Sequence, residues 1–187
     1  MFYEQGIVSN NLILKNLEMI DCNENYLNWL NDEEVNKFLE TRWYPQSIKS
    51  IQSFVDEINK SEHSYLFGIF YKEDNNSLIH IGNVKIGPIH KFYSYADISY
   101  FIGDKNYWGK GLATEAIKSV LKFGFEVLNL NRIQAGVFSS NIASIKALEK
   151  AGLILEGNFR KQLYTKDLCD DHLFYGILKE DWLKNYK

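Results

Sequence analysis

Cysteine and proline are scarce in this chain, and positive charge is not in excess. The 187 residues include two cysteines and two prolines, and the formal net charge is −3 at pH 7. Cys22 and Cys169 have no partners at zinc-ligand spacing, since the nearest candidate, His172, stands alone. The sequence therefore predicts reduced thiols, no disulfide framework and no metal. Two prolines leave no room for a proline-rich linker, and a negative net charge argues against a nucleic-acid partner.

Long hydrophobic runs are absent as well. The longest are far shorter than the about 20 apolar residues that a membrane helix needs. The first four residues, Met1 to Glu4, contain neither the basic nor the apolar region of a secretory signal. We therefore expect a cytoplasmic protein with no membrane partner. What the chain does contain is material for a core, because 45% of its residues are hydrophobic and 15% aromatic. Its length predicts a single domain over residues 1–187.

The apolar residues alternate between strand-like and helix-like spacing. Strands are expected over residues 12–17, 65–71, 78–86, 95–103, 132–138, 153–164 and 172–178. Two or three short helices are expected within residues 22–60, and longer ones over 112–128 and 142–151. Early helices, antiparallel strands in the middle and then alternating strands and helices predict an α+β fold with a mixed α/β sheet.

A glycine-rich loop, Asn106-Tyr107-Trp108-Gly109-Lys110-Gly111, joins an expected strand to the clearest expected helix. Unpaired amides at a helix N-terminus, with glycines that permit close approach, favour a phosphate group. A Walker loop fits poorly, because five residues instead of four separate Gly103 from Gly109 and a glycine follows Lys110. The dinucleotide fingerprint is also weak, since Thr114 replaces its third small residue and no acidic residue follows the next strand.

This succession of strand, glycine-rich loop and helix resembles the signature of the GNAT superfamily of acyl-CoA-dependent N-acetyltransferases, in which the loop has the sequence Q/R-x-x-G-x-G/A. The second half of the chain resembles it too, with Asn141-x-x-Ser144, then Ala-Leu-Glu-Lys-Ala-Gly-Leu and Leu155-Glu156-Gly157. The resemblance covers a core of about residues 12–182 and is nearest to the branch of ribosomal-protein N-terminal and amino-sugar acetyltransferases. It implies a central, mostly antiparallel twisted sheet flanked by helices. One departure is Asn106, where the family has Gln or Arg.

The resemblance implies that acetyl-CoA is the acetyl donor. Its pyrophosphate would lie on the amides of the loop and of the first helical turn, and its pantetheine arm would pair with the preceding strand as though adding a strand. The residues assigned to CoA in this way are Phe101, Ile102, Gly103, Trp108, Gly109, Lys110, Gly111, Leu112, Ala113, Thr114, Asn141 and Ser144. Asn141 is also a good helix N-cap, and both roles can hold at once.

Two residues are candidates for proton transfer. Asp97, in Ala96-Asp97-Ile98, resembles the position where several family members keep a glutamate base, and its shorter side chain favours a relaying water. Ser144 resembles the serine that protonates the CoA sulfur in the ribosomal N-terminal enzymes. A solvated carboxylate and a plain helix serine are the alternatives for these two. Leu163 stands where those enzymes have a second glutamate.

The strength of the base bears on the acceptor. Deprotonating a chain-terminal amine at pH 7 costs about 1 kcal/mol, whereas a lysine costs about 4 to 5 kcal/mol. A short aspartate therefore suits an amine of modest pKa. Candidate acceptor-binding residues, able to stack on a ring or to grip a phosphate, are Trp29, Arg42, Trp43 and Tyr44.

We therefore expect an amine of a small polar metabolite, such as an amino-sugar nucleotide, as the acceptor. A protein N-terminus is the first alternative, because Glu33, Glu34 and Glu40 could form an acidic groove for a basic peptide. A non-catalytic acyl-CoA-binding regulator is the second, and a nicotinamide or ATP enzyme is the third. The sequence leaves the oligomeric state open, a dimer being one alternative.

Overall fold

The computed structural model describes residues 6–75, 77–165 and 169–185, so the expectation about residues 1–4 lies outside them. The strands are β1 (Ile7–Val8), β2 (Leu12–Asn16), β3 (Tyr65–Lys72), β4 (Leu78–His90), β5 (Tyr95–Ile102), β6 (Arg132–Phe138), β7 (Ile154–Tyr164) and β8 (Cys169–Leu178). The helices are α1 (Glu24–Asn31), α2 (Glu33–Asn36), α3 (Ile48–Asn59), α4 (Leu112–Lys122), α5 (Ile142–Lys150) and α6 (Lys179–Asn185). Shorter 3-10 turns are η1 (Met19–Asp21), η2 (Glu40–Trp43) and η3 (Lys105–Tyr107), and η4 (Phe123–Val127) is a π-helical turn.

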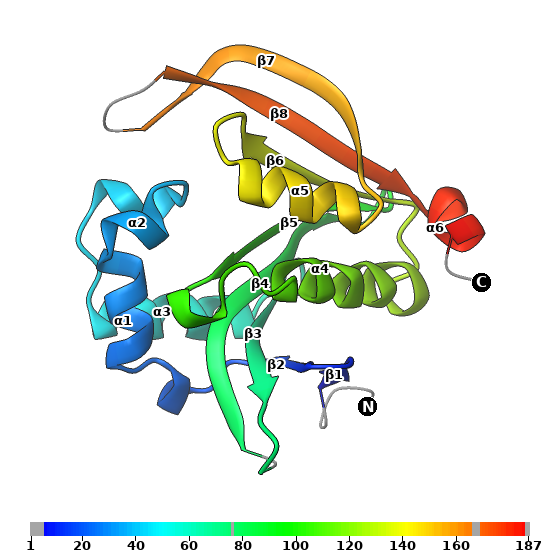
Figure 1. Ribbon diagram of the computed structural model, residues 1–187. Coiled ribbons are helices and arrows are strands. Elements are labelled where there is room, and N and C mark those ends of the chain that lie inside the picture. The colour runs from blue at the N-terminus through cyan, green and yellow to red at the C-terminus, as the bar shows by residue number, and fades with distance from the viewer. Residues whose placement is uncertain (1–5, 76, 166–168, 186–187) are drawn as a thin grey trace.

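The strands form one sheet in the order β1-β2-β3-β4-β5-β6-β8-β7. All neighbours are antiparallel except β5 and β6, which are parallel. Figure 1 shows α4 and α5 on one face of this sheet and α3 on the other. The predicted α+β fold with a mostly antiparallel sheet is confirmed.

Strand alternation gives the sheet a hydrophobic core on each face. In β3, Phe67 and Ile69 join the core under α4, whereas Leu66 and Phe70 join the core under α1 and α3. The larger core also contains buried residues of β2, β4, β5, β6, α5 and β8. The two cores hold helices against both faces of the sheet at β5, the strand that carries much of the expected site.

The predicted helix over residues 112–128 is present, but its last turn winds as the π-helix η4. Three consecutive residues of this turn, Phe123, Gly124 and Phe125, are buried. A Cβ on Gly124 would lie 2.5 Å from Cδ1 of Ile133, so the glycine lets the helix approach β6 closely.

Short elements at the chain ends differ from the sequence expectation. The two-residue β1 and the helix α6 were not predicted, because neither is long enough to show a period. β8 begins at Cys169 rather than His172, and β4 extends to His90 through an irregularity after Ile86. Within the described ranges, no helix has the length and apolar character required to cross a membrane.

Candidate active site

The two parallel strands in the middle of the sheet separate along their length. β5 and β6 are paired at only three positions, the last of which joins Asp97 to Gln134. Beyond it, β5 stays paired with β4 up to Ile102, and β6 stays paired with β8 up to Phe138. Alternate residues of a strand direct their N–H and C=O groups to the same side, so β5 presents to the gap main-chain groups that β6 does not pair with. At the end of β5, the carbonyl of Ile102 accepts a hydrogen bond from Nε1 of Trp108 at 2.8 Å. We call this gap the wedge.

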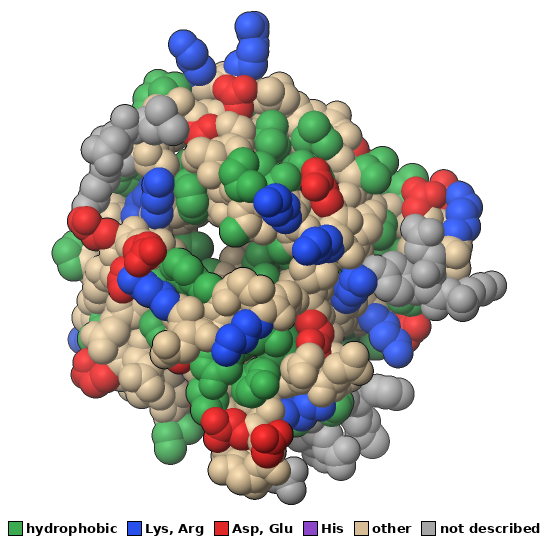
Figure 2. All heavy atoms as spheres, viewed as in Figure 1, with side chains coloured by type: hydrophobic (Ala, Val, Ile, Leu, Met, Phe, Trp, Pro, Cys, Tyr) green, Lys and Arg blue, Asp and Glu red, His purple; other side chains and the backbone are tan. Residues whose placement is uncertain are grey.

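The surface is hollowed where the wedge opens. Figure 2 shows an opening, bordered by hydrophobic side chains, between the region of α2 and the turn that joins β6 to α5. The wedge is therefore accessible from outside.

The glycine-rich loop follows directly on the open end of β5. The amides of Gly103 and Asp104 both donate to the carbonyl of Ile81, which fixes the start of the loop. Gly109 and Gly111 have φ of +72° and +78°, a left-handed conformation that only glycine adopts readily. An added Cβ on either glycine would meet no atom within 4 Å, so both face open space.

Gly111 is also the N-cap of α4, and it offers no side chain to the first amides of the helix. These amides remain available to an anion, which the helix dipole favours at this end. The predicted CoA loop therefore forms an open cradle, and its chemistry fits a pyrophosphate.

The turn between β6 and α5 borders the wedge on the other side. Oδ1 of Asn141 accepts a hydrogen bond from the amide of Ser144 at 3.2 Å, so Asn141 is the N-cap of α5. The carbonyl of Ser144 accepts from the hydroxyl of Tyr100 at 3.1 Å, which joins α5 to β5. The side chain of Ser144 also forms a hydrogen bond with Tyr100, which places its hydroxyl at the border of the wedge.

A buried carboxylate that sequence reasoning missed holds this turn in place. Asp170 of β8 is 5% exposed and accepts from the amide of Ser140 at 3.0 Å and from the hydroxyls of Ser139 and Ser140. Burial by itself would raise the pKa of Asp170, but these hydrogen bonds outweigh it and hold the pKa below its usual value. Asp170 thus fixes the residues immediately before Asn141.

The catalytic candidate Asp97 lies at the vertex of the wedge. Its neighbours Ala96 and Ile98 are buried in the core under α4, so strand alternation directs Asp97 to the opposite face. Its Oδ1 accepts a hydrogen bond from Nε2 of Gln134 at 3.0 Å. A half-buried carboxylate at this point can receive a proton from a group that enters the wedge.

Residues 11–154 match the model of the family described as the acetyltransferase (GNAT) domain. The chain belongs to this family. It is 38% identical over 134 residues, 71% of each chain, to the probable N-acetyltransferase YjcK of Bacillus subtilis (strain 168). It is 28% identical over 180 residues, 94% of this chain and 98% of the relative, to the uncharacterized N-acetyltransferase YnaD of the same organism.

Solved structures agree with this assignment. The chain superposes on the spermidine N-acetyltransferase of Vibrio cholerae, solved with CoA and spermine, with a TM-score of 0.82. The two chains share 22% identity, and the match covers 94% of this chain and 99% of the other. The predicted GNAT fold and acyltransferase class are confirmed.

Arg42, an expected phosphate ligand of this GNAT protein, is placed differently from the expectation. Its side chain is only 5% exposed. Nη1 donates to the carbonyl of Leu39 at 2.6 Å, and Nη2 donates to the carbonyl of Tyr164 at 2.7 Å. Because both terminal nitrogens are engaged, the guanidinium cannot offer a free fork to a phosphate. Arg42 instead holds the end of β7 against η2.

The other acceptor-side candidates divide into two groups. Trp43 and Tyr44 are 46% and 76% exposed and can contact a ligand. Trp29 is half-buried, and its ring covers Gly103, where an added Cβ would lie 2.2 Å from Cδ2 of the indole. Trp29 therefore forms a wall at the end of β5 rather than an open stacking surface.

The acidic groove expected for a basic peptide is partly neutralised. Glu34 and Asp32 both bind the ammonium of Lys105, at 2.6 and 2.8 Å. Glu40 contacts Arg42 at 3.3 Å. Two of the three expected acidic residues are thus already paired with a cation.

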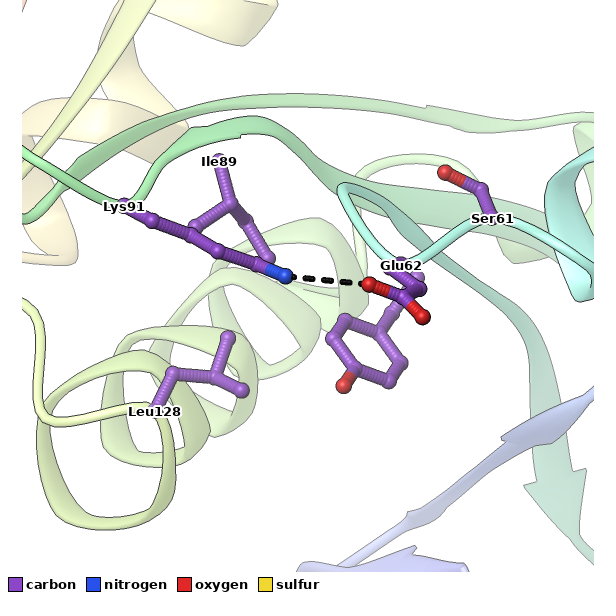
Figure 3. A pocket seen from close by; sticks show the side chains of 6 residues that line it. Ser61, Glu62, Ile89, Lys91 and Leu128 are labelled. Carbon is purple, nitrogen blue, oxygen red and sulfur yellow. Dashed lines mark hydrogen bonds and ion pairs between the residues drawn. The ribbon is translucent and has the colours of Figure 1, made fainter.

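A separate cavity of about 420 Å³ lies at the opposite end of β5 (Figure 3). It is lined by Ser61, Glu62, Tyr65, Ile89, Lys91 and Leu128. Lys91 and Glu62 form an exposed ion pair of 3.3 Å at this cavity. Since β5 is paired on both sides at this end, the cavity is not part of the wedge. No group of three or more metal-ligating side chains occurs in the described parts of the chain.

Proposed function

We propose that this GNAT protein acetylates a primary amine of a small polar metabolite. The observation that carries the proposal is the wedge, because it combines an unpaired strand edge with a carboxylate at its vertex. The glycine cradle at the open end of β5 supports the same reaction, since it suits the pyrophosphate of the donor.

Binding of the donor is assigned to main-chain groups. The pantetheine arm would pair with Phe101 to Gly103, and the pyrophosphate would lie on the amides of Gly109 to Thr114. Acetyl-CoA supplies an activated thioester when bound. The backbone of this chain supplies the orientation, which brings the acetyl group and the amine together.

Proton transfer is assigned to two side chains. Asp97 would accept a proton from the amine through a water molecule, because its side chain is short. An amine with a pKa of about 8 requires only about 1 kcal/mol for deprotonation at pH 7, so this modest base suffices. Ser144, whose hydroxyl lies beside Tyr100 at the border of the wedge, would donate to the departing sulfur. A thiol with a pKa of about 8.5 leaves easily, so this second role is the less demanding one.

Three observations favour a small amine over a protein N-terminus. Trp43 and Tyr44 offer exposed rings for stacking. Glu34 and Glu40 are already paired with cations, which weakens a peptide groove. Leu163 replaces the second glutamate of the ribosomal N-terminal enzymes. The internal bonds of Arg42 remove one reason to expect a nucleotide phosphate, so an amino-sugar nucleotide is one candidate among several amines.

A two-stage experiment tests the proposal. Thermal shifts are first measured with acetyl-CoA, CoA, NAD and ATP, and stabilisation by the two CoA compounds alone is expected. Thiol release from acetyl-CoA is then followed with amino sugars, amino-sugar nucleotides, polyamines and N-terminal peptides. Polyamines are included because the Vibrio cholerae structure contains spermine.

Three outcomes contradict the proposal. Stabilisation by NAD or ATP in place of CoA would contradict the donor. A peptide with a kcat/KM above that of every small amine would contradict the acceptor. CoA binding without thiol release to any amine would instead favour the acyl-CoA-binding regulator.

A further inference from the structure

Four polar side chains form a continuous row across the C-terminal half of the sheet. Glu156 of β7 accepts from Nη1 of Arg132 at 2.8 Å and also from Nη2. Nε of Arg132 donates to Oε1 of Gln134 at 3.1 Å, and Nε2 of Gln134 donates to Oδ1 of Asp97 at 3.0 Å. The row therefore connects the edge strand β7 to the vertex of the wedge.

The row crosses β8 at a glycine. β8 lies between β6 and β7, so the ion pair of Arg132 and Glu156 must pass over it. A Cβ on Gly176 would lie 2.4 Å from Oε2 of Glu156 and 2.6 Å from Nη2 of Arg132. Glycine therefore leaves room for the ion pair over β8, and a larger residue would displace the ends of these two side chains.

The chemistry of arginine fixes the direction of the hydrogen bonds. A guanidinium only donates, so the carbonyl oxygen of Gln134 must face Arg132. The amide nitrogen of Gln134 must then face Asp97, as a donor. The hydrogen bonds with Glu156 raise the pKa of Arg132, and those with Arg132 lower the pKa of Glu156, so both ends of the ion pair stay charged. The charged pair therefore holds this orientation of Gln134.

We propose that Gln134 is a positioning residue for Asp97, oriented by the ion pair of Arg132 and Glu156. The inference rests on the proposed function, in which Asp97 is the base. The amide of Gln134 occupies Oδ1 of Asp97 and leaves Oδ2 to receive a proton from the amine or its water.

Other charges also face Asp97. Arg132 and Glu156 lie along the row on β6 and β7. From β4, Lys85 pairs with Ser99, which is the next residue after Asp97 on the same face of β5. These three charges are present in every variant below, so they do not alter the comparison.

Two variants of Gln134 test the inference. Gln134→Met keeps the length of the side chain but donates no hydrogen bond. We expect kcat to fall by about 10- to 100-fold, with the KM for acetyl-CoA unchanged. Gln134→Glu still accepts from Arg132 but places a carboxylate beside Asp97. We expect the acid limb of the kcat/KM profile to move up by about one pH unit or more. Gln52→Met, on α3, is the matched control.

A double-mutant cycle separates positioning from general damage. In an Asp97→Asn background, Gln134→Met should lower the residual rate no further. An equal loss in both backgrounds would overturn the inference, as would a wild-type pH profile in Gln134→Glu. Because Gln134→Glu retains the contact with Arg132, it remains informative if Gln134→Met does not fold.

Failure of the inference and failure of the proposed function give different results. If the wild-type protein transfers acetyl to no amine, the proposed function is wrong. If it transfers acetyl but both Gln134 variants keep the wild-type kcat and pH profile, only the positioning role is wrong.

Discussion

Replacing Gly111 with alanine tests the cradle most directly, because the structure lets us separate the loss of protein stability from the loss of CoA affinity. The residue has a φ of +78°, and an added Cβ would meet no atom of the protein within 4 Å. The cost to the free protein is therefore conformational rather than steric. A non-glycine residue in the left-handed region costs about 1 to 2 kcal/mol. For a chain of this size, that corresponds to a fall in Tm of about 2 to 8 °C.

The substitution should also lower the affinity of the protein for CoA. The open space beside Gly111 is where a pyrophosphate would approach the amides of α4, and a methyl group there would displace it. We therefore expect the affinity for CoA to fall by at least tenfold, about 1.4 kcal/mol or more. Calorimetric titration with CoA measures this loss, and thermal denaturation without CoA measures the first cost.

Two further variants separate the contributions. Gly111→Asn should recover part of the Tm, because asparagine tolerates the left-handed region, and yet bind CoA weakly. Gly157→Ala is the matched control, since Gly157 has no positive φ and the nearest atom to its added Cβ is 3.9 Å away. Wild-type CoA affinity in both Gly111 variants would refute the assignment of the cradle to a phosphate.

Three other perturbations have defined outcomes. Asp97→Asn should lower kcat/KM by about 10² to 10⁴ with unchanged CoA affinity, and Ser144→Ala should lower kcat/KM by a smaller factor. An unchanged rate of Asp97→Asn in steady-state assays would exclude Asp97 as the base. Arg42→Ala should lower the free energy of unfolding by about 1 to 3 kcal/mol, because two carbonyls lose their donor. A change in the acceptor KM without a change in stability would contradict this. Asp170 has a lowered pKa, so it stabilises the fold above the unfolded pKa of about 3.9, and this stability disappears as the pH falls through the folded value. Asp170→Asn should therefore weaken the pH dependence of the free energy of unfolding, measured by denaturant titration between about pH 6 and 2. An unaltered pH dependence would argue against this role of Asp170.

Features that depend only on neighbouring residues are predictable from the amino-acid sequence. The spacing of apolar residues in α4 predicts one buried stripe, and the glycines before it predict the turn that opens the helix. Asn141 likewise predicts a helix start, because its side chain caps an amide only three residues away. Each of these signals lies within a few residues of the structure that it specifies.

Contacts between groups that are far apart in the sequence become visible only in the folded chain. Arg42 donates to a carbonyl 122 residues away, and Asp97 accepts from Gln134, 37 residues away. No local pattern distinguishes such an arginine from an exposed one, because the partner is a main-chain oxygen that every residue possesses. The separation of β5 from β6 cannot be predicted locally either, because neither strand sequence contains a signal for it. The gap arises because β5 continues its pairing with β4 while β6 continues its pairing with β8. The chemistry of the wedge depends on such long-range pairing, which forms only when the two cores pack on the sheet.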